Sequence, residues 1–291
     1  MKRAGSASPE APRPDWTIEQ DWDGYTPAEH GLWRRLFSRQ ARVLARRVVS
    51  EFLAGLERLG IAAEGIPDFR RLNDVLDRAT GWRVVAVPGL VPDEVFFEHL
   101  ANRRFPATCF IRRPDQVDYI EEPDIFHDIY GHAPLLVHPV FADYLQAYGQ
   151  GGLKALRLGS LSNLARLYWY TVEFGLIRTA DGLRLYGSGI ASSKGESIYC
   201  LDDPRPNRLA FDLLRIMRTN YRIDAYQETY FVIDSFDQLF DATRPDFAPY
   251  YRQLADLPDI APAEVLPTDR VIDPVTPSAI RAARRPRAAR P

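Results

Sequence analysis

The chain has 291 residues, 46% of them hydrophobic, so it can build the core of one large domain or two small ones. Its 37 basic and 39 acidic side chains nearly balance, which gives no reason to expect nucleic acid or an anionic membrane as a partner. No apolar run is long enough to span a membrane, and the N-terminus lacks the apolar core of a secretory signal. The two cysteines, Cys109 and Cys200, argue against a disulfide framework and favour a reducing cytoplasm.

Two ends of biased composition flank the central part of the chain. Residues 1–15 are rich in Pro, Ala and Ser, which predicts a disordered N-terminal tail. Residues 267–291 are rich in Pro and Arg and predict a solvated basic tail, with a nucleic-acid or membrane contact as the lesser alternative. Residues 16–266 show no repeat at a fixed period, and we expect them to form one continuous domain.

The first predicted element is helical and covers residues 25–60, "YTPAEHGLWRRLFSRQARVLARRVVSEFLAGLERLG". Thr26 can cap this helix, Pro27 suits its first turn, and Glu29 stands where a capping box needs an acid. Apolar residues recur near the helical period until Gly60, which is typical of a helix end. The pattern allows either one long helix or two.

The rest of the chain predicts further helices joined by short strands and loops. We expect a mainly α (α+β) fold, because the regular strand and helix alternation of a doubly wound parallel sheet is missing. The predicted helices are 66–81, 93–104, 140–152, 160–179, 205–221 and 235–247, the short strands are 82–89, 105–112 and 227–234, and a loop or hairpin covers 185–197.

Two histidines in "EEPDIFHDIYGHAPLL" are candidate metal ligands. Five positions along an α-helix turn by about 500°, which leaves His127 and His132 about 140° apart. Helical periodicity therefore does not show that they share a metal, although Gly131 and Pro134 loosen the backbone around the second histidine. A shared metal site and a pair of packed or surface histidines both remain open.

A carboxylate inside the apolar run "LYWYTVEFGLI" is the third candidate ligand. Burying the unpaired charge of Glu173 is costly, so it needs a cation or several hydrogen-bond donors. Arg166 and Arg178 do not have the spacing of helix partners, and a metal ion is the other solution. Two imidazoles and one carboxylate suit non-haem iron with open coordination positions. They also suit a catalytic zinc, but the H-E-x-x-H motif of zinc proteases is absent, so a zinc-dependent hydrolase is the alternative.

The motif "PDIFHDIYGHAPLL", followed further on by "YWYTVEFGL", resembles the pterin-dependent aromatic amino acid hydroxylases, especially their short bacterial members. The likeness runs from near residue 20 to near residue 240 and implies the fold of that family, with 16–266 as the catalytic domain. It implies phenylalanine 4-monooxygenase activity, which converts L-phenylalanine to L-tyrosine with dioxygen in phenylalanine catabolism. The cofactors implied are Fe(II), held by His127, His132 and Glu173, and tetrahydrobiopterin or a related tetrahydropterin.

The resemblance also assigns cofactor-binding roles to a loop, an acid and two aromatic rings. The loop would contact the pterin through its backbone, and one ring would stack on the pterin. The acid would lie on the pterin side of the site, and the second ring beside the iron. Core packing is the structural alternative for the stacking ring. The loop residues are Gly89, Leu90 and Val91, and the stacking ring is Phe96. The acid is Asp128, and the ring beside the iron is Tyr168.

A second group of positions matches the family's binding site for the amino acid. Arg112 would bind the substrate carboxylate through its guanidinium fork, and Asp124 would position that arginine. Trp169 would form a wall of the pocket for the aromatic ring. Gly189 would allow close approach, and Ser192 would hydrogen-bond a ligand histidine. Without the resemblance, Arg112 would read as a surface arginine.

Departures from the animal members leave the fine substrate preference open. Ile120 and Glu121 stand where those enzymes have threonine and proline, so the same chemistry on another aromatic amino acid, such as tryptophan, is an alternative. A binding protein without catalysis is another. Because few residues precede the likeness, we expect no folded regulatory domain. We therefore expect a cytoplasmic monomer whose partners are small molecules, with no nucleic acid or membrane.

Overall fold

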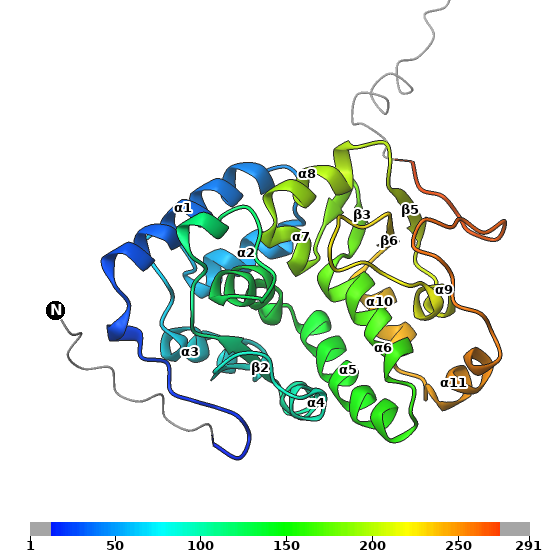
Figure 1. The fold of residues 1–291 in the computed structure, drawn as a ribbon, viewed down its shortest axis with the longest axis horizontal. Helices are drawn as coiled ribbons and strands as arrows, with labels where there is room; N and C mark the ends of the chain where they lie inside the picture. The colour runs from blue at the N-terminus through cyan, green and yellow to red at the C-terminus, as the bar shows by residue number, and fades with distance from the viewer. Residues whose placement is uncertain (1–12, 274–291) are drawn as a thin grey trace, which may run out of the picture.

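The protein is described by a computed structural model that covers residues 13–273 (Figure 1). Helices dominate it, and the strands are few and short, as the sequence predicts. The strands are β1 (Arg83–Val87), β2 (Arg104–Thr108), β3 (Leu176–Thr179), β4 (Gly182–Leu185), β5 (Asn207–Ala210) and β6 (Thr229–Ile233). The α-helices are α1 (Pro27–Leu44), α2 (Ser50–Leu59), α3 (Phe69–Thr80), α4 (Asp93–Ala101), α5 (Pro139–Arg157), α6 (Leu161–Tyr168), α7 (Ser188–Ser192), α8 (Lys194–Asp202), α9 (Leu213–Arg218), α10 (Phe236–Thr243) and α11 (Ala248–Ala255).

The first predicted helical stretch forms two helices, α1 and α2. The predicted capping box is present, because the Glu29 amide donates to the Thr26 hydroxyl and the Thr26 amide donates to the Glu29 carboxylate. Gly60 ends α2 in the left-handed conformation, with φ of +63°. The break between the helices falls where Val48 and Val49 pair with the backbone of Leu185 at the end of β4. Branched residues favour such extended pairing over helix.

The strands form two small sheets that lie beside the helices. β1 and β2 pair in parallel as a two-stranded sheet. The second sheet has the order β4-β3-β6-β5, with an antiparallel β3–β4 hairpin and parallel pairs on both sides of β6. All five residues of β6 are buried, as expected for a central strand covered on both faces.

Three predicted elements differ from the structure. The helix predicted over 160–179 is α6 followed by a π-helix and then β3. The helix predicted over 205–221 begins with β5, and the loop predicted over 185–197 contains α7 and the start of α8. In the two predicted helices the segments that form strands are only four residues long, and periodicity alone cannot separate a short helix from a buried strand. Pairing with β6 decides for strand in β3 and β5. Helix α11 follows the last predicted helix and has no counterpart in the prediction.

The N-terminal tail was predicted to reach residue 15, but Asp15 packs against the domain. Its carbonyl oxygen lies 2.9 Å from Nε2 of the buried His99, and its carboxylate lies 3.2 Å from the Arg104 guanidinium. These partners belong to α4 and β2, so the folded part begins earlier than the composition indicates. Residues 1–12 of the predicted tail lie outside the described residues.

The predicted C-terminal tail, 267–291, likewise starts inside the folded domain. Asp269 forms a buried ion pair with Arg215 of α9 at 3.0 Å, and Val271 bridges to β5. Within residues 267–273 the chain is therefore irregular but packed against the domain. Residues 274–291, which hold most of the arginines of this tail, lie outside the described residues.

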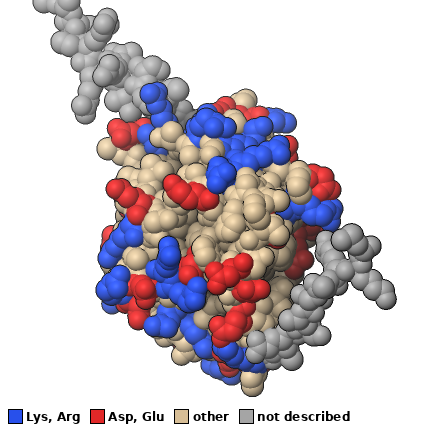
Figure 2. All heavy atoms as spheres, turned by 90° about the vertical axis from the view of Figure 1, so that its left-hand side faces the viewer, with Lys and Arg blue, Asp and Glu red and all other residues tan. Residues whose placement is uncertain are grey.

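The balanced charge and moderate hydropathy of the sequence are reflected in the surface of the domain and in the length and polarity of its helices. Figure 2 shows one face of the molecule, on which Lys and Arg side chains lie among Asp and Glu side chains. Over the described range, 13–273, every helix is too short or too polar to cross a bilayer.

Candidate metal centre and active site

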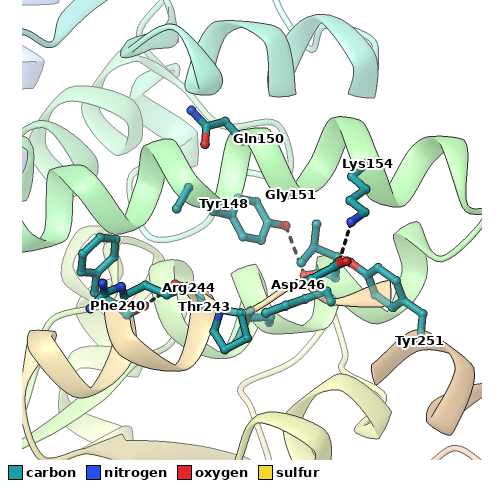
Figure 3. Close-up of a pocket in the computed structure, with 14 residues that line it drawn as sticks. Tyr148, Gln150, Gly151, Lys154, Phe240, Thr243, Arg244, Asp246 and Tyr251 are labelled. Atoms are coloured by element: carbon teal, nitrogen blue, oxygen red, sulfur yellow. Dashed lines mark hydrogen bonds and ion pairs between the residues drawn. The ribbon is translucent and has the colours of Figure 1, made fainter. Parts of the chain in front are cut away.

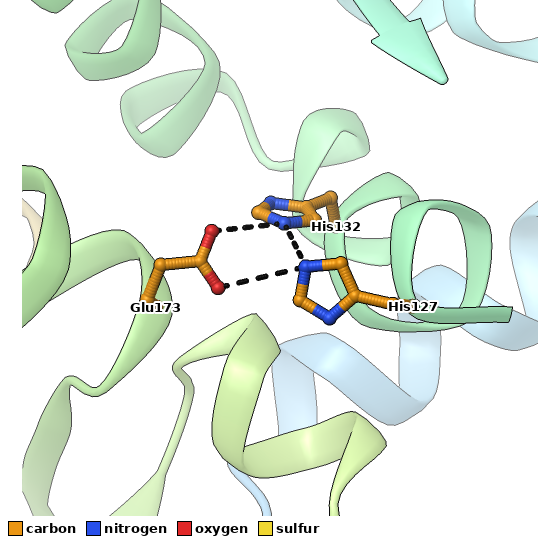
Figure 4. Close-up of side chains that lie close together, drawn as sticks. All are labelled: His127, His132 and Glu173. Carbon is orange, nitrogen blue, oxygen red and sulfur yellow. Dashed lines mark hydrogen bonds and ion pairs between the residues drawn. The ribbon is translucent and has the colours of Figure 1, made fainter. Parts of the chain in front are cut away.

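His127, His132 and Glu173 meet at one point of the structure (Figure 4). Nε2 of His132 lies 3.2 Å from Nε2 of His127 and 3.2 Å from one oxygen of Glu173. The other Glu173 oxygen lies 3.7 Å from Nε2 of His127. All the candidate ligand atoms lie within 4.8 Å of one another, which is the spacing of atoms that share one ion.

The two histidines converge because they lie on a π-helix, Phe126–His132. In a π-helix the hydrogen bonds join residues five apart, so its turns are wider than those of an α-helix and positions five apart lie close to the same face. Glu173 is the last residue of a second π-helix, Trp169–Glu173. The separation calculated for an α-helix does not apply to His127 and His132, and both ligand-bearing segments depart from α-helix at the site itself.

The arginine partners considered for Glu173 bind elsewhere. Arg166 pairs with Asp259 at 2.6 Å, and Arg178 lies 3.3 Å from Asp234. The Glu173 carboxylate instead accepts a hydrogen bond of 2.9 Å from the Ser188 hydroxyl. Its side chain is 12% exposed, and its nearest polar neighbours are the two imidazoles and this hydroxyl rather than a guanidinium.

The protonation states favour cation binding. Burial lowers the pKa of His127 to about 4, so its imidazole is neutral near neutral pH. Burial alone would raise the pKa of Glu173, but His132, His127 and the Ser188 hydroxyl together lower it to about 2. A neutral imidazole nitrogen of His127 and the anionic carboxylate of Glu173 therefore face a common point, beside which Nε2 of His132 also lies. This donor set fits a non-haem iron, with three protein ligands and coordination positions left for other groups.

Ser192 fixes the ring of His127. The Ser192 hydroxyl donates to the backbone oxygen of Ser188 at 2.9 Å and lies 2.9 Å from Nδ1 of His127. Because the hydroxyl has a single proton, Nδ1 of His127 must donate to it. The ring is thus held as the Nδ1–H tautomer, and Nε2 keeps its lone pair for a metal. The predicted contact of Ser192 with a ligand histidine is present.

Arg112 and Asp124 form a buried pair beside the metal ligands. Nε and Nη2 of Arg112 donate to the two Asp124 oxygens at 2.9 and 2.7 Å, and their side chains are 5% and 0% exposed. Asp124 also accepts from the backbone amide of His127 at 3.1 Å. The same carboxylate therefore orients the predicted substrate arginine and the start of the metal-binding π-helix.

Asp128, predicted on the pterin side, is held by Thr108 at the end of β2. One Asp128 oxygen accepts from both the backbone amide and the hydroxyl of Thr108, each at 2.8 Å. Burial raises the pKa of Asp128 to about 7 despite these two hydrogen bonds. The side chain is fixed in place and lies next to His127 in the chain.

The rings predicted beside the pterin and the iron are connected to each other. Phe96 is half-buried and meets Tyr168 edge to face, with centroids 5.8 Å apart. Tyr168 in turn lies 6.4 Å from the ring of His132 in a near-parallel arrangement. Within residues 13–273 no ring stacks in parallel on Phe96, which is compatible with a flat cofactor there.

The predicted pterin loop, Gly89–Val91, follows β1 and is open to solvent. Leu90 is 74% exposed, and a side chain at Gly89 would lie 3.1 Å from the Glu122 carboxylate. The loop therefore offers backbone groups rather than a packed apolar wall. Helix α4, which carries Phe96, follows this loop in the chain.

Trp169 and Gly189 lie on two sides of a phenylalanine ring. The rings of Trp169 and Phe174 have centroids 4.8 Å apart. A Cβ atom on Gly189 would lie 3.0 Å from Phe174 and 3.1 Å from the Glu173 carboxylate. Gly189 therefore allows α7 to approach the Glu173 carboxylate closely.

Sequence reasoning missed three contributors to the site. Ser188 bonds the ligand carboxylate, Thr108 holds Asp128, and Phe174 packs between Trp169 and Gly189. Serine and threonine occur throughout the chain, and nothing local marks these two. Phe174 directly follows Glu173, so its position next to a ligand was the one available signal.

A cavity of about 500 Å³ lies apart from the triad, between α5, α10 and α11 (Figure 3). It is lined by Tyr148, Phe247 and Tyr251, and an ion pair between Lys154 and Asp246 closes one side. None of the predicted site residues lines it. The Tyr148 ring also lies 5.2 Å from that of Tyr168, so the two regions share aromatic packing.

Fold and site together define an enzyme class: a helix-rich domain that can hold iron on two histidines and one glutamate. A sequence model of the biopterin-dependent aromatic amino acid hydroxylases matches residues 22–254. The chain belongs to this family. That membership confirms the predicted fold class and the dependence on a biopterin. It also favours hydroxylase chemistry over the zinc-dependent hydrolase.

Individual relatives are closely similar along almost the whole chain. The phenylalanine-4-hydroxylase of Ralstonia nicotianae is 66% identical over 261 residues, which are 90% of this chain and 83% of that protein. The corresponding protein of Caulobacter vibrioides is 60% identical over 264 residues, or 91% and 90% of the two chains. A crystal structure of Chromobacterium violaceum phenylalanine hydroxylase with iron and phenylalanine bound superposes with a TM-score of 0.86. It is 60% identical and covers 89% of this chain and 94% of its own.

Proposed function

We propose that the protein converts L-phenylalanine to L-tyrosine with dioxygen, using Fe(II) and a tetrahydropterin. The observation that carries this proposal is the meeting of His127, His132 and Glu173 in a chain of the biopterin-dependent family. The substrate is inferred from relatives at 60–66% identity that are phenylalanine-4-hydroxylases.

The protein side chains have a limited task in this reaction. A bound tetrahydropterin would supply two electrons and a bound iron would take part in activating dioxygen, so that one oxygen atom would enter the ring and the other would leave as water. His127, His132 and Glu173 would hold the metal. The hydrogen bond from His127 to Ser192 and that from Ser188 to Glu173 would keep these two ligands oriented toward it. The aromatic lining excludes water from the reacting groups.

Arg112 is proposed to bind the substrate carboxylate through one particular edge of its guanidinium. Nε and Nη2 already donate to Asp124, whereas within residues 13–273 no acceptor is bonded to Nη1. The edge formed by Nη1 and the second proton of Nη2 is therefore available for a two-point contact. Asp124 would keep that edge turned toward the substrate, and the remaining predicted residues are proposed in the roles given above.

One set of assays tests the proposed function. Protein loaded with Fe(II) is incubated with tetrahydropterin, dioxygen and, separately, phenylalanine, tyrosine or tryptophan, and the products are identified by mass spectrometry. We expect tyrosine from phenylalanine only when metal, pterin and oxygen are all present. Hydroxylation of tryptophan instead would change the substrate. Activity that needs zinc and no oxygen would contradict the proposal.

We further propose that the catalytic domain acts as a monomer in the cytoplasm, with small molecules as its partners. Both cysteines are free thiols, and Cys200 is fully buried, which suits a reducing compartment. The domain is proposed to extend over 16–266 with the short packed extensions at each end described above. Sedimentation equilibrium of the full chain tests the oligomeric state, and a dimer would contradict the proposal.

A further inference from the structure

The indole of Trp169 is held by a hydrogen bond as well as by packing. Its N–H donates to the side-chain oxygen of Gln227 at 2.9 Å. One face of the ring stacks on Tyr221, with centroids 4.2 Å apart and planes 16° apart. Stacking alone would allow the indole to slide across Tyr221 or to flip, because the two faces of the ring are chemically similar. The hydrogen bond selects one orientation.

Trp169 is one aromatic ring away from a metal ligand. Its ring packs against Phe174 at 4.8 Å, and Phe174 lies against Gly189 beside the Glu173 carboxylate. Trp169 is itself only partly buried, so part of its surface remains accessible. An error in the angle of the indole would therefore change the space available to a ring bound near the metal.

Gln227 is built into the structure at three points. Its side chain is part of a residue only 2% exposed, and its amide nitrogen donates to the backbone oxygen of Arg222 at 2.7 Å. Its backbone N–H donates to the carboxylate of the buried Glu196 at 3.0 Å. Glu196 also accepts a hydrogen bond of 2.7 Å from the Tyr230 hydroxyl. Because both ends of the amide are bonded, Gln227 cannot turn without breaking two hydrogen bonds.

We infer that Gln227 is a positioning residue that fixes the indole of Trp169 for the aromatic ring of the substrate. The inference rests on the proposed function, which makes Trp169 a wall of the substrate pocket. Gln227 also closes the loop 222–227 through Arg222, so the loop and the indole are set by the same amide. A glutamine is needed because the site demands one acceptor and one donor from the same group.

The principal test is Gln227→Met, which keeps length and apolar volume but removes both hydrogen bonds of the amide. We expect the dissociation constant for L-phenylalanine, measured by calorimetry, and its KM to rise roughly three- to tenfold. The KM for tetrahydropterin should not change. The yield of tyrosine per pterin oxidised should fall, because the ring is less well aligned while pterin oxidation continues.

Gln20→Met is a matched control for loss of a bridging amide. Gln20 donates to the backbone oxygen of Pro67 at 3.0 Å and accepts from the amide of Phe69 at 2.8 Å, away from the metal ligands. This variant should lose thermal stability but keep the KM for L-phenylalanine and the yield of tyrosine. A general loss of stability is thereby separated from a loss of positioning.

Trp169→Phe completes a double-mutant cycle. Phenylalanine has no N–H to give to Gln227, so in this background Gln227→Met should cause no further change in L-phenylalanine affinity. The inference is wrong if Gln227→Met leaves the affinity for L-phenylalanine unchanged. It is also wrong if Gln227→Met changes that affinity equally in the unaltered protein and in Trp169→Phe. Failure of the unaltered protein to form tyrosine would instead refute the proposed function, and the binding data would still test Gln227.

Discussion

Two serines hold the metal ligands in place, one for each ligand type. Ser192 accepts the proton of His127 Nδ1, and Ser188 donates to the Glu173 carboxylate. Both belong to α7, so this five-residue helix fixes an imidazole from one π-helix and a carboxylate from the other. Hydrogen bonds of this kind set the orientation and basicity of metal ligands.

Ser192→Ala should weaken metal binding without unfolding the protein. The His127 ring loses the partner that selects its tautomer, and the affinity for iron should fall about 10- to 100-fold. Equilibrium dialysis against Fe(II) measures this change. Ser197→Ala is the control, since Ser197 is equally buried and bonds a backbone oxygen of α7 but no ligand. An equal loss of iron affinity in both variants would contradict the role of Ser192.

Arg112→Lys should weaken binding of L-phenylalanine directly, in addition to any loss of stability that it causes. A lysine keeps the charge but cannot bind Asp124 and the substrate at two points each. We expect the KM for L-phenylalanine to rise about tenfold or more. Arg215→Lys breaks a similarly buried pair, with Asp269, away from the site. Arg215→Lys should lower the melting temperature about as much as Arg112→Lys and leave the KM for L-phenylalanine unchanged. An equal rise in KM in both variants would refute the assignment of Arg112.

At the scale of elements, the π-helices mark the limit of what periodicity can predict. The α1 capping box and the stop at Gly60 follow from local chemistry, and both are present. The convergence of His127 and His132 could not be derived, because the spacing argument assumes α-helical geometry and the chain forms a π-helix there. The ligand set came from likeness of motif, and the tertiary contacts of α7 could not be foreseen.

A second feature at this scale is the close packing of α2 on the segment after the second histidine. A Cβ atom on Gly55 would lie 2.0 Å from the backbone oxygen of Pro134, so neither element can give way without moving its backbone. Pro134 belongs to the short 3₁₀ helix Ala133–Val137, which continues the metal-binding π-helix. Helix α2 therefore packs against the segment that directly follows the ligand His132.

Gly55→Ala should destabilise the protein, whereas the same change at Gly31 should not. The added methyl group at Gly55 forces α2 away, at a cost of about 1–3 kcal/mol. Gly31 lies inside α1 with nothing within 4 Å of a Cβ atom, so alanine there should stabilise by about 0.5–1 kcal/mol through helix propensity. Urea denaturation measures both. Stabilisation by Gly55→Ala would show that the contact is not as close as described.

For the molecule as a whole, a pH effect on stability is expected from Glu196, which lies outside the metal site. Burial raises its pKa from the usual 4.5 to about 7, even though Gln227 and Tyr230 donate to it. The tyrosines and Cys200 around it are neutral in this range, and burial raises the pKa of Cys200 and of Tyr230. The folded state therefore holds the Glu196 proton more tightly than the unfolded chain does.

The sign of this effect on stability follows from proton linkage. A carboxyl group with a raised pKa contributes stability that is fully present below pH 4.5 and is lost as the pH rises through about 7. The loss amounts to roughly 3 kcal/mol at most. Glu196→Gln cannot ionise, so the free energy of unfolding of the unaltered protein should fall relative to this variant between pH 5 and pH 8. A difference that is constant with pH would contradict the prediction.

The most direct test of the central claim, oxygenation of phenylalanine at a metal held by His127, His132 and Glu173, uses dioxygen labelled with oxygen-18. Iron-loaded protein is supplied with labelled dioxygen, tetrahydropterin and L-phenylalanine, and the tyrosine formed is analysed by mass spectrometry. The account predicts one heavy oxygen in each tyrosine, and no tyrosine from Glu173→Ala, which loses a ligand. Unlabelled tyrosine, or unchanged activity in Glu173→Ala, would contradict it.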